Sequence, residues 1–194
     1  MPRPRTTSDE EILEATGRAL NQVGVGRLTL AVVAREAGLA PATLVQRFGS
    51  KRGLLLAFER YATGEARTPF IEARAGHPAP LDALQAALAA LASGVRTPEE
   101  LANSMSVLQL DLTDPEHREL ALIHTRATQE EIAGLLADAV AAGDLVPGTD
   151  PARLARAVHV AYNGAHILWA LSGEGELLEH LRDDVDHVLA PYRA

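Results

Sequence analysis

The sequence predicts an all-α protein of about nine helices. Apolar residues recur every three or four positions along almost the whole chain, which is the period of an amphipathic helix, and no convincing alternation indicates a strand. Helix start signals are frequent, because a capping residue precedes proline at Thr97-Pro98, Asp114-Pro115 and Asp150-Pro151. With 47% hydrophobic residues among 194, the chain has ample apolar material for a buried core.

The first helix is expected over about Asp9–Val23. Ser8 and Glu11 have the spacing of a capping box, in which each side chain bonds a free backbone N–H of the other. Gly24 follows the last apolar position and ends the segment. Residues 2–5, which alternate proline and arginine, leave two interpretations open, a disordered tail or an arm that enters the minor groove of DNA.

Two short helices joined by a tight turn are expected next. The first opens at Thr29, whose hydroxyl can cap a backbone N–H, and runs to Ala37. Gly38 stops it, because glycine readily adopts the left-handed backbone that ends a helix. The second covers about Pro41–Phe48, with proline in the first turn, where its ring pre-sets the helical φ angle. This is the layout of a helix-turn-helix reader of DNA.

The second of these short helices has an apolar side and a polar side. Leu44 and Phe48, four residues apart, face inward, and Thr43, Gln46 and Arg47 face outward. Side chains of these polar types can reach the edges of bases or the phosphates of a duplex.

The fourth helix begins after Ser50, its expected N-cap, and runs over about 51–64. Lys51 is the only lysine of the chain and stands at the N-terminus of this helix. An ammonium group and free backbone N–H groups in one place favour a phosphate oxygen.

Over residues 9–62 the chain resembles the tetracycline-repressor (TetR-like) family of bacterial transcription regulators. Four stretches have the family's spacing: Thr29-Leu30, Val33-Ala34 with Ala37-Gly38-Leu39, Ala42-Thr43-Leu44, and Phe48-Gly49-Ser50-Lys51. The resemblance implies a cytoplasmic homodimer that binds an operator in double-stranded DNA and leaves it when a small-molecule effector binds. The implied domains are a DNA-binding domain over 1–50, a connecting helix over 51–64 and a regulatory, dimerising domain over 65–194.

One position departs from the family's pattern. Val45 stands where the family usually has an aromatic residue, most often tyrosine, which packs on the DNA backbone and reaches a phosphate. A valine can touch a thymine methyl group but donates no hydrogen bond, so DNA affinity or preference is expected to differ. The alternative interpretation of Gln46 and Arg47 is that they are ordinary solvent-exposed surface residues without a role in DNA binding. The residues expected at DNA are Thr29, Thr43, Val45, Gln46, Arg47 and Lys51.

The net charge of −8 is divided unevenly along the chain. Residues 1–60 carry nine Lys or Arg against six Asp or Glu, whereas residues 61–194 carry nine against twenty. Because charges beyond about 10 Å are largely screened at 0.1 M salt, a modestly basic end can hold DNA while an acidic remainder faces away.

The remainder of the chain predicts further helices. Residues 68–80 contain three prolines and a glycine and are expected to form a loop or a broken helix. Apolar periodicity and start signals then predict helices over about 81–95, 98–112, 115–142, 151–173 and 176–189.

The last two long helices carry broad apolar faces, which predict a homodimer through a four-helix bundle. Two DNA-reading helices must lie about 34–36 Å apart to enter successive major grooves, and a dimer is required to provide two such helices. The apolar faces comprise Leu154, Val158, Ala161, Ala165 and Leu168 on one helix and Leu177, Leu178, Leu181, Val185 and Leu189 on the other. Charged substitution of Leu181 or Val185 is expected to break this dimer.

Polar and aromatic residues among apolar ones are candidates for an effector cavity. An ordinary role in the core or the dimer interface is an equally good interpretation of His166 and Trp169. A mainly apolar cavity favours a flat or apolar small molecule. The candidates are Met105, Gln109, His124, Tyr162, Asn163, His166 and Trp169.

The sequence argues against other classes of protein. No apolar run approaches the about 18 residues of a membrane span, and the N-terminus lacks a signal peptide's apolar core, so a cytoplasmic location is expected. With no cysteine, thiol catalysis and thiolate zinc sites are excluded. No catalytic residues, cofactor or metal are expected, since the sequence shows neither an HExxH pair nor a carboxylate–histidine cluster. The alternative is a helical interaction module or metal-binding protein without sequence-specific DNA binding.

Overall fold

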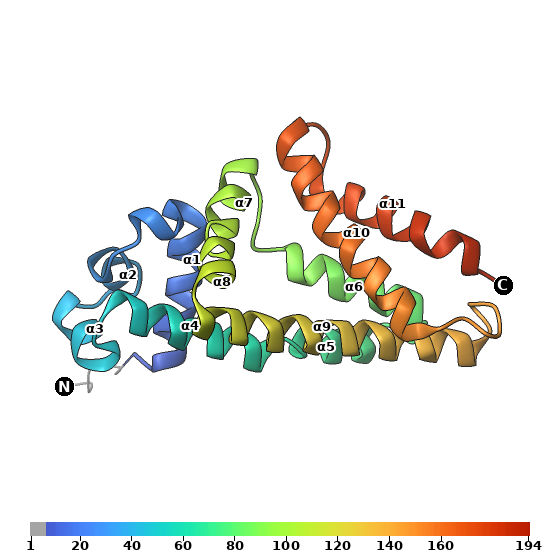
Figure 1. Cartoon of the computed structure of the whole chain (residues 1–194), viewed down its shortest axis with the longest axis horizontal. Helices are drawn as coiled ribbons and strands as arrows, with labels where there is room; N and C mark the ends of the chain where they lie inside the picture. Colours follow the sequence, from blue (N-terminus) through green and yellow to red (C-terminus); the bar gives the residue numbers. More distant parts are fainter. Residues whose placement is uncertain (1–6) are drawn as a thin grey trace. The chain divides into compact units, whose positions relative to one another are not determined.

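The computed structural model describes residues 7–194, which fold into two compact units. The first unit contains the described chain up to Gly64 together with residues 100–121, and the second contains residues 65–99 and 122–194. Figure 1 shows that both units are built from helices. Within the described residues the extended backbone pairing is a single bridge between Leu145 and Arg193, so the all-α prediction is confirmed. The arginine-containing segment 2–5 lies outside the described residues.

The first unit is made of six helices and the beginning of a seventh. Their bounds are α1 Asp9–Arg27, α2 Leu30–Glu36, α3 Pro41–Phe48, α4 Lys51–Glu65, α7 Pro98–Met105, α8 Leu108–Thr113 and, at its start, α9 Pro115–Ala142. The expected capping box is present, because Ser8 and Glu11 bond each other's backbone N–H groups at 3.1 and 2.8 Å. Gly24 is kinked out of the helical conformation at φ 69°, as its place after the last apolar residue predicts.

Residues 100–121 belong to the first unit through contacts with the end of α1. The hydroxyl of Ser106 accepts a hydrogen bond from the backbone N–H of Val25 at 2.7 Å. The side-chain amide of Asn103 donates to the carbonyls of Asn21 and Gln22 at 3.0 and 3.1 Å. These bonds satisfy backbone groups that the kink of α1 would leave free.

The second unit packs its helices around one apolar core. Its helices are α5 Thr68–Gly76, α6 Pro80–Ala92, the remainder of α9, α10 Pro151–Ser172 and α11 Leu177–Leu189, followed by the short η1 Ala190–Tyr192. Phe70, Leu84, Leu136 and Val158, from four different helices, are fully buried in this core. No described helix is long and apolar enough to cross a membrane.

Each expected helical segment is helical, with two differences in detail. Residues 68–76, expected to be a loop or a broken helix, form α5, because Pro69 lies in its first turn and Phe70 and Ala73 are buried. The helix expected over 98–112 is interrupted between Met105 and Leu108, where Ser106 bonds the end of α1.

The apolar faces of α10 and α11 are largely buried within the chain itself. Of the residues expected to pair with a second subunit, Leu154, Val158, Leu181 and Val185 are 3% exposed or less. The two helices pack on each other and on the core of the second unit. A stripe that includes Leu168 and Leu178 of the expected faces remains open to solvent, and we name it the outer stripe. It consists of Val160, Ile167, Leu168 and Leu171 on α10 with Leu178 on α11.

Candidate functional site

The α2–turn–α3 segment has the conformation that its glycines predict. Gly38 has φ 69°, and the following Leu39 donates its N–H back to the carbonyl of Ala34 at 2.7 Å, which closes the turn. Leu44 is fully buried and fixes α3 against the unit's core. The opposite side of α3 is therefore held outward by packing.

The six residues expected at DNA lie within or beside this segment. Val45 is 51% exposed and Gln46 is exposed on α3, whereas Thr43 is half-buried. Thr29 is exposed at the start of α2, where its hydroxyl accepts the N–H of Val32 at 3.2 Å, so the expected cap is confirmed.

The two cations among these residues already have partners within the protein. Arg47 donates through Nη1 to the carbonyl of Thr7 at 2.7 Å and pairs with Asp9 at 3.1 Å, which connects α3 to the start of α1. Lys51 donates through Nζ to the carbonyl of Val25 and is half-buried. Sequence spacing alone gives no sign of these contacts, because Val25 and Lys51 lie 26 positions apart.

The start of α4 lies very close to the end of α3. The hydroxyl of Ser50 accepts the N–H of Gly53 at 3.0 Å, so Ser50 caps α4 as expected. A Cβ placed on Gly53 would lie 2.2 Å from the carbonyl oxygen of Phe48. Only glycine fits there without a backbone shift, and α4 is thereby held directly against α3.

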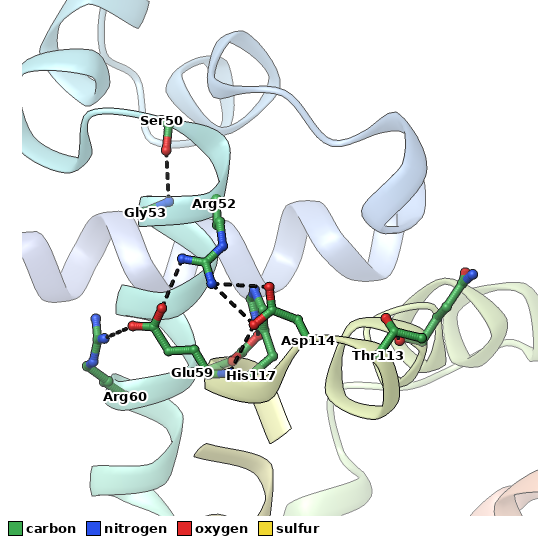
Figure 2. Close-up of polar contacts among 10 residues, drawn as sticks. Ser50, Arg52, Gly53, Glu59, Arg60, Thr113, Asp114 and His117 are labelled. Atoms are coloured by element: carbon green, nitrogen blue, oxygen red, sulfur yellow. Dashed lines mark hydrogen bonds and ion pairs between the residues drawn. The ribbon is translucent and has the colours of Figure 1, made fainter. Parts of the chain in front are cut away.

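An ion-pair network joins α4 to the beginning of α9 on the surface of the first unit. Arg52 pairs with Asp114 at 3.1 Å, as Figure 2 shows, and with Glu116 at 2.9 Å. Arg60, two turns further along α4, pairs with the other oxygen of Glu116 at 2.8 Å. Hydrogen bonding from Arg52 is the main reason that the pKa of Asp114 lies below its ordinary value.

A partly buried acid–histidine cluster, formed by Glu59, Asp111 and His117, lies beside this network. Nδ1 of His117, which is only 2% exposed, lies 2.6 Å from Oε1 of Glu59 (Figure 2). Asp111 lies nearby, so that one oxygen or nitrogen from each of the three residues is within 4.8 Å of the others. Burial raises the pKa of Glu59, with His117 opposing the shift, and burial also raises the pKa of Asp111.

Sequence inspection missed this cluster. Asp111 and His117 are six positions apart, and Glu59 comes from a distant part of the chain, so no contiguous motif announces them. A groove of about 410 Å³ in the first unit reaches His117 and is also lined by Lys51, Arg52, Leu55 and Leu110.

The seven effector candidates do not all belong to one unit. Met105 and Gln109 are part of the first unit, in α7 and α8, and the other five are part of the second. Gln109 is exposed and Met105 is half-buried.

On α10 the effector candidates make mainly local contacts. The rings of Tyr162 and His166 lie 4.5 Å apart, and Nδ1 of His166 lies 2.8 Å from the carbonyl of Tyr162. Asn163 donates to the carbonyl of His159 at 2.9 Å. Trp169 donates to Gly175 at 3.1 Å.

Burial shapes the titration of these groups. Burial raises the pKa of Tyr162, and it lowers the pKa of His166 and of the neighbouring His159. His124 adds to the lowering at His159, which places an α9 side chain within electrostatic reach of α10. The second unit also has a more polar groove of about 380 Å³ between α6 and α11, lined by Asp82, Gln85, Arg182 and Asp186 among others.

Comparison with known families gives two matches. Residues 12–58 match the family described as bacterial regulatory proteins, tetR family, and residues 80–185 match the tetracyclin repressor-like C-terminal domain. The comparison with curated proteins gave no match.

Several solved structures have the same fold. A Rhodococcus sp. protein assigned to the TetR regulators is 27% identical, covers 93% of this chain and 97% of its own, and has a TM-score of 0.68. A TetR transcription regulator from Haloarcula marismortui is 18% identical, with coverages of 96% and 98% and a TM-score of 0.78. SmeT, the repressor of the Stenotrophomonas maltophilia multidrug efflux pump SmeDEF, is 22% identical, with coverages of 96% and 91% and a TM-score of 0.69.

Proposed function

This chain belongs to the tetR family of bacterial regulatory proteins, and we propose that it is a repressor whose α3 reads an operator and releases it when a small molecule binds the second unit. Members of this family bind DNA operators and small-molecule effectors, are generally dimeric and are typically non-enzymatic. The observation that carries the proposal is the exposed polar side of α3, held outward by the buried Leu44. An interaction module without DNA binding is not favoured, because the family matches span both parts of the chain.

The proposed DNA contacts divide by position. Gln46 and Val45, which are exposed on α3, contact base edges, with Val45 against a thymine methyl group. Thr29 and Thr43 contact phosphates. Arg47 reaches the backbone while keeping its bonds to the start of α1, since a guanidinium has five N–H donors and both internal contacts use Nη1.

Lys51 has a double role in this proposal. Its ammonium group has three donors, one of which holds the carbonyl of Val25, and it lies at the N-terminus of α4, where backbone N–H groups also favour an anion. We propose that a phosphate binds there and that Lys51 positions α4 on the duplex.

Proposed dimerisation uses the outer stripe rather than the buried faces of α10 and α11. Val160, Leu168 and Leu171 lie on one side of α10 and are 62%, 65% and 79% exposed in the isolated chain. Pairing this stripe with a second copy would bury it and set two α3 helices at the spacing of successive major grooves.

Leu171→Glu tests the interface. We expect it to give a folded monomer with little DNA affinity, as measured by analytical ultracentrifugation and circular dichroism. Leu181→Glu is the contrasting variant, because Leu181 is 3% exposed and its replacement is expected to unfold the second unit. A Leu171→Glu protein that stays dimeric would place the interface elsewhere.

The proposed effector site lies on α10, around Tyr162, His166 and Trp169. Its aromatic rings and few hydrogen-bonding groups suit a flat, mainly apolar molecule. SmeT has been solved in complex with triclosan, and it is 24% identical to this chain with a TM-score of 0.69. The effector must bind the released form better than the DNA-bound form, because equal affinity for both would shift nothing.

Selection of bound sequences from random DNA, followed by electrophoretic shift, tests the DNA-binding proposal. A twofold-symmetric operator is expected. Gln46→Ala is expected to weaken binding to that operator by about tenfold, the loss of one base contact, without changing the melting temperature. Gln22→Ala is the matched control, since Gln22 is exposed on α1. Binding without sequence preference, or equal losses in both variants, would contradict the assignment of α3 as the reader.

A further inference from the structure

The cluster of Glu59, Asp111 and His117 contains a buried oxygen atom that no hydrogen bond satisfies. Oε2 of Glu59 is buried and accepts no hydrogen bond from the described residues. The Glu59 side chain as a whole is only 11% exposed. An unpaired buried carboxylate oxygen is costly unless something else occupies its lone pairs.

The charges of the cluster are also out of balance. Two carboxylates lie within 4.8 Å of each other, and His117 offers at most one positive charge to the pair. The nearby guanidinium of Arg60 is engaged by Glu116. A divalent cation bound by the three residues would supply positive charge to this site.

We propose that Glu59, Asp111 and His117 bind a divalent transition-metal ion that joins α4 to α8 and α9 within the first unit. One imidazole nitrogen with two carboxylates is a ligand set for Zn²⁺ and its neighbours in the first transition row, whereas Mg²⁺ prefers oxygen ligands alone. The ion takes the place of the proton that Nδ1 of His117 shares with Oε1 of Glu59. The otherwise unsatisfied Oε2 of Glu59 then coordinates the ion or lies in contact with it.

The geometry is close to what such an ion requires. Ligand atoms about 2.1 Å from a tetrahedral ion lie about 3.4 Å apart. The three donor atoms lie within 4.8 Å of one another, so the farthest pair must close by at most about 1.4 Å, a movement that rotation of the Glu59 and Asp111 side chains supplies. The groove that reaches His117 gives the ion a path from solvent.

Zn²⁺ titration of the metal-free full-length protein tests the site. After dialysis against a chelator, calorimetry and elemental analysis are expected to show one tightly bound Zn²⁺ per chain, and Mg²⁺ is expected not to compete. Asp111→Asn and Glu59→Gln are expected to weaken that binding by about tenfold or more. Glu119→Gln, at an exposed acid of α9, is the matched control and is expected to bind as the wild type does.

A thermal readout separates this site from surface histidines. Zn²⁺ at a hundredfold excess over its wild-type dissociation constant is expected to raise the wild-type melting temperature by about 5 °C, and to raise that of Asp111→Asn by about half as much or less. Asp111→Asn is the decisive variant, because it keeps the side-chain shape, and circular dichroism without metal verifies its fold.

Two results would overturn the metal site: no Zn²⁺ binding by the wild type, or equal Zn²⁺ affinity in the wild type, Asp111→Asn and Glu119→Gln. Neither result would contradict the proposed operator binding, which is tested separately by selection of bound DNA sequences.

Discussion

The junction of α4 with α8 and α9 differs from α10 in how its polar side chains are satisfied. In the junction they bond residues far away in sequence, as Arg52 does with Asp114 and Glu59 with His117. On α10 they bond carbonyls four to six positions away, as Asn163, His166 and Trp169 do. The junction is therefore specified by polar contacts between helices. On α10, by contrast, the polar side chains form local hydrogen bonds, and the helix packs on its neighbours through apolar surface.

This difference suits the two roles proposed for these regions. Directional contacts between helices fix the position of α4 directly behind the reading helix. An apolar surface with locally satisfied polar groups imposes few directional demands on what packs against it, which fits a region that accommodates a small molecule.

The largest expected effect compares the two histidines. His117→Leu leaves Glu59 buried without its partner, and we expect unfolding free energy to fall by about 3 kcal/mol. His166→Leu removes only a bond to its own helix, and a loss of about 1 kcal/mol is expected. Urea denaturation at pH 7, without added metal, measures both. Equal losses would erase the distinction between junction and α10.

A backbone variant extends the comparison to the start of α4. Gly53→Ala places a methyl group 2.2 Å from the carbonyl of Phe48, where backbone must move, so a loss of about 2 kcal/mol is expected. Gly26→Ala is the matched control, because nothing lies within 4 Å of its added Cβ, and a change within about 0.5 kcal/mol is expected. Thermal denaturation of both proteins checks the difference, and a well-tolerated Gly53→Ala would show that α3 and α4 are not held so closely.

The smallest effect is expected at Tyr162 and appears only in alkali. Burial raises the folded-state pKa of Tyr162, so the folded protein keeps its proton where the unfolded chain begins to lose it. Stability is then full below an unfolded pKa of about 10 and falls as pH rises above it. Tyr162→Phe is expected to be nearly neutral at pH 7 and to reduce the alkaline loss. Denaturation at pH 7 and pH 11 makes the test, and an unchanged alkaline loss would contradict it.

The sequence predicted the conformation of the α2–turn–α3 segment well because its determinants are local. Thr29 caps, Gly38 turns and Leu44 packs, and each acts within a few residues of its position. The pairing of Glu59 with His117 joins residues 58 positions apart, and no spacing rule connects them.

The apolar stripes of α10 and α11 illustrate a different limit. A helical period shows which face is buried but not what covers it, so Leu181 and Val185, expected at a dimer interface, are core residues of their own subunit. The break near Ser106 likewise comes from a hydrogen bond to a distant backbone group.

The assignment of residues 100–121 to the first unit means that the polypeptide passes from one unit to the other three times. A fragment ending at Gly64 would carry every residue proposed to touch DNA, yet it would lack Ser106, Asn103 and the apolar cover of Val107 and Leu110. A truncated N-terminal fragment would thus lack part of its own packing surface. Exchange of the DNA-binding unit between relatives requires that both stretches, the chain up to Gly64 and residues 100–121, be transferred together.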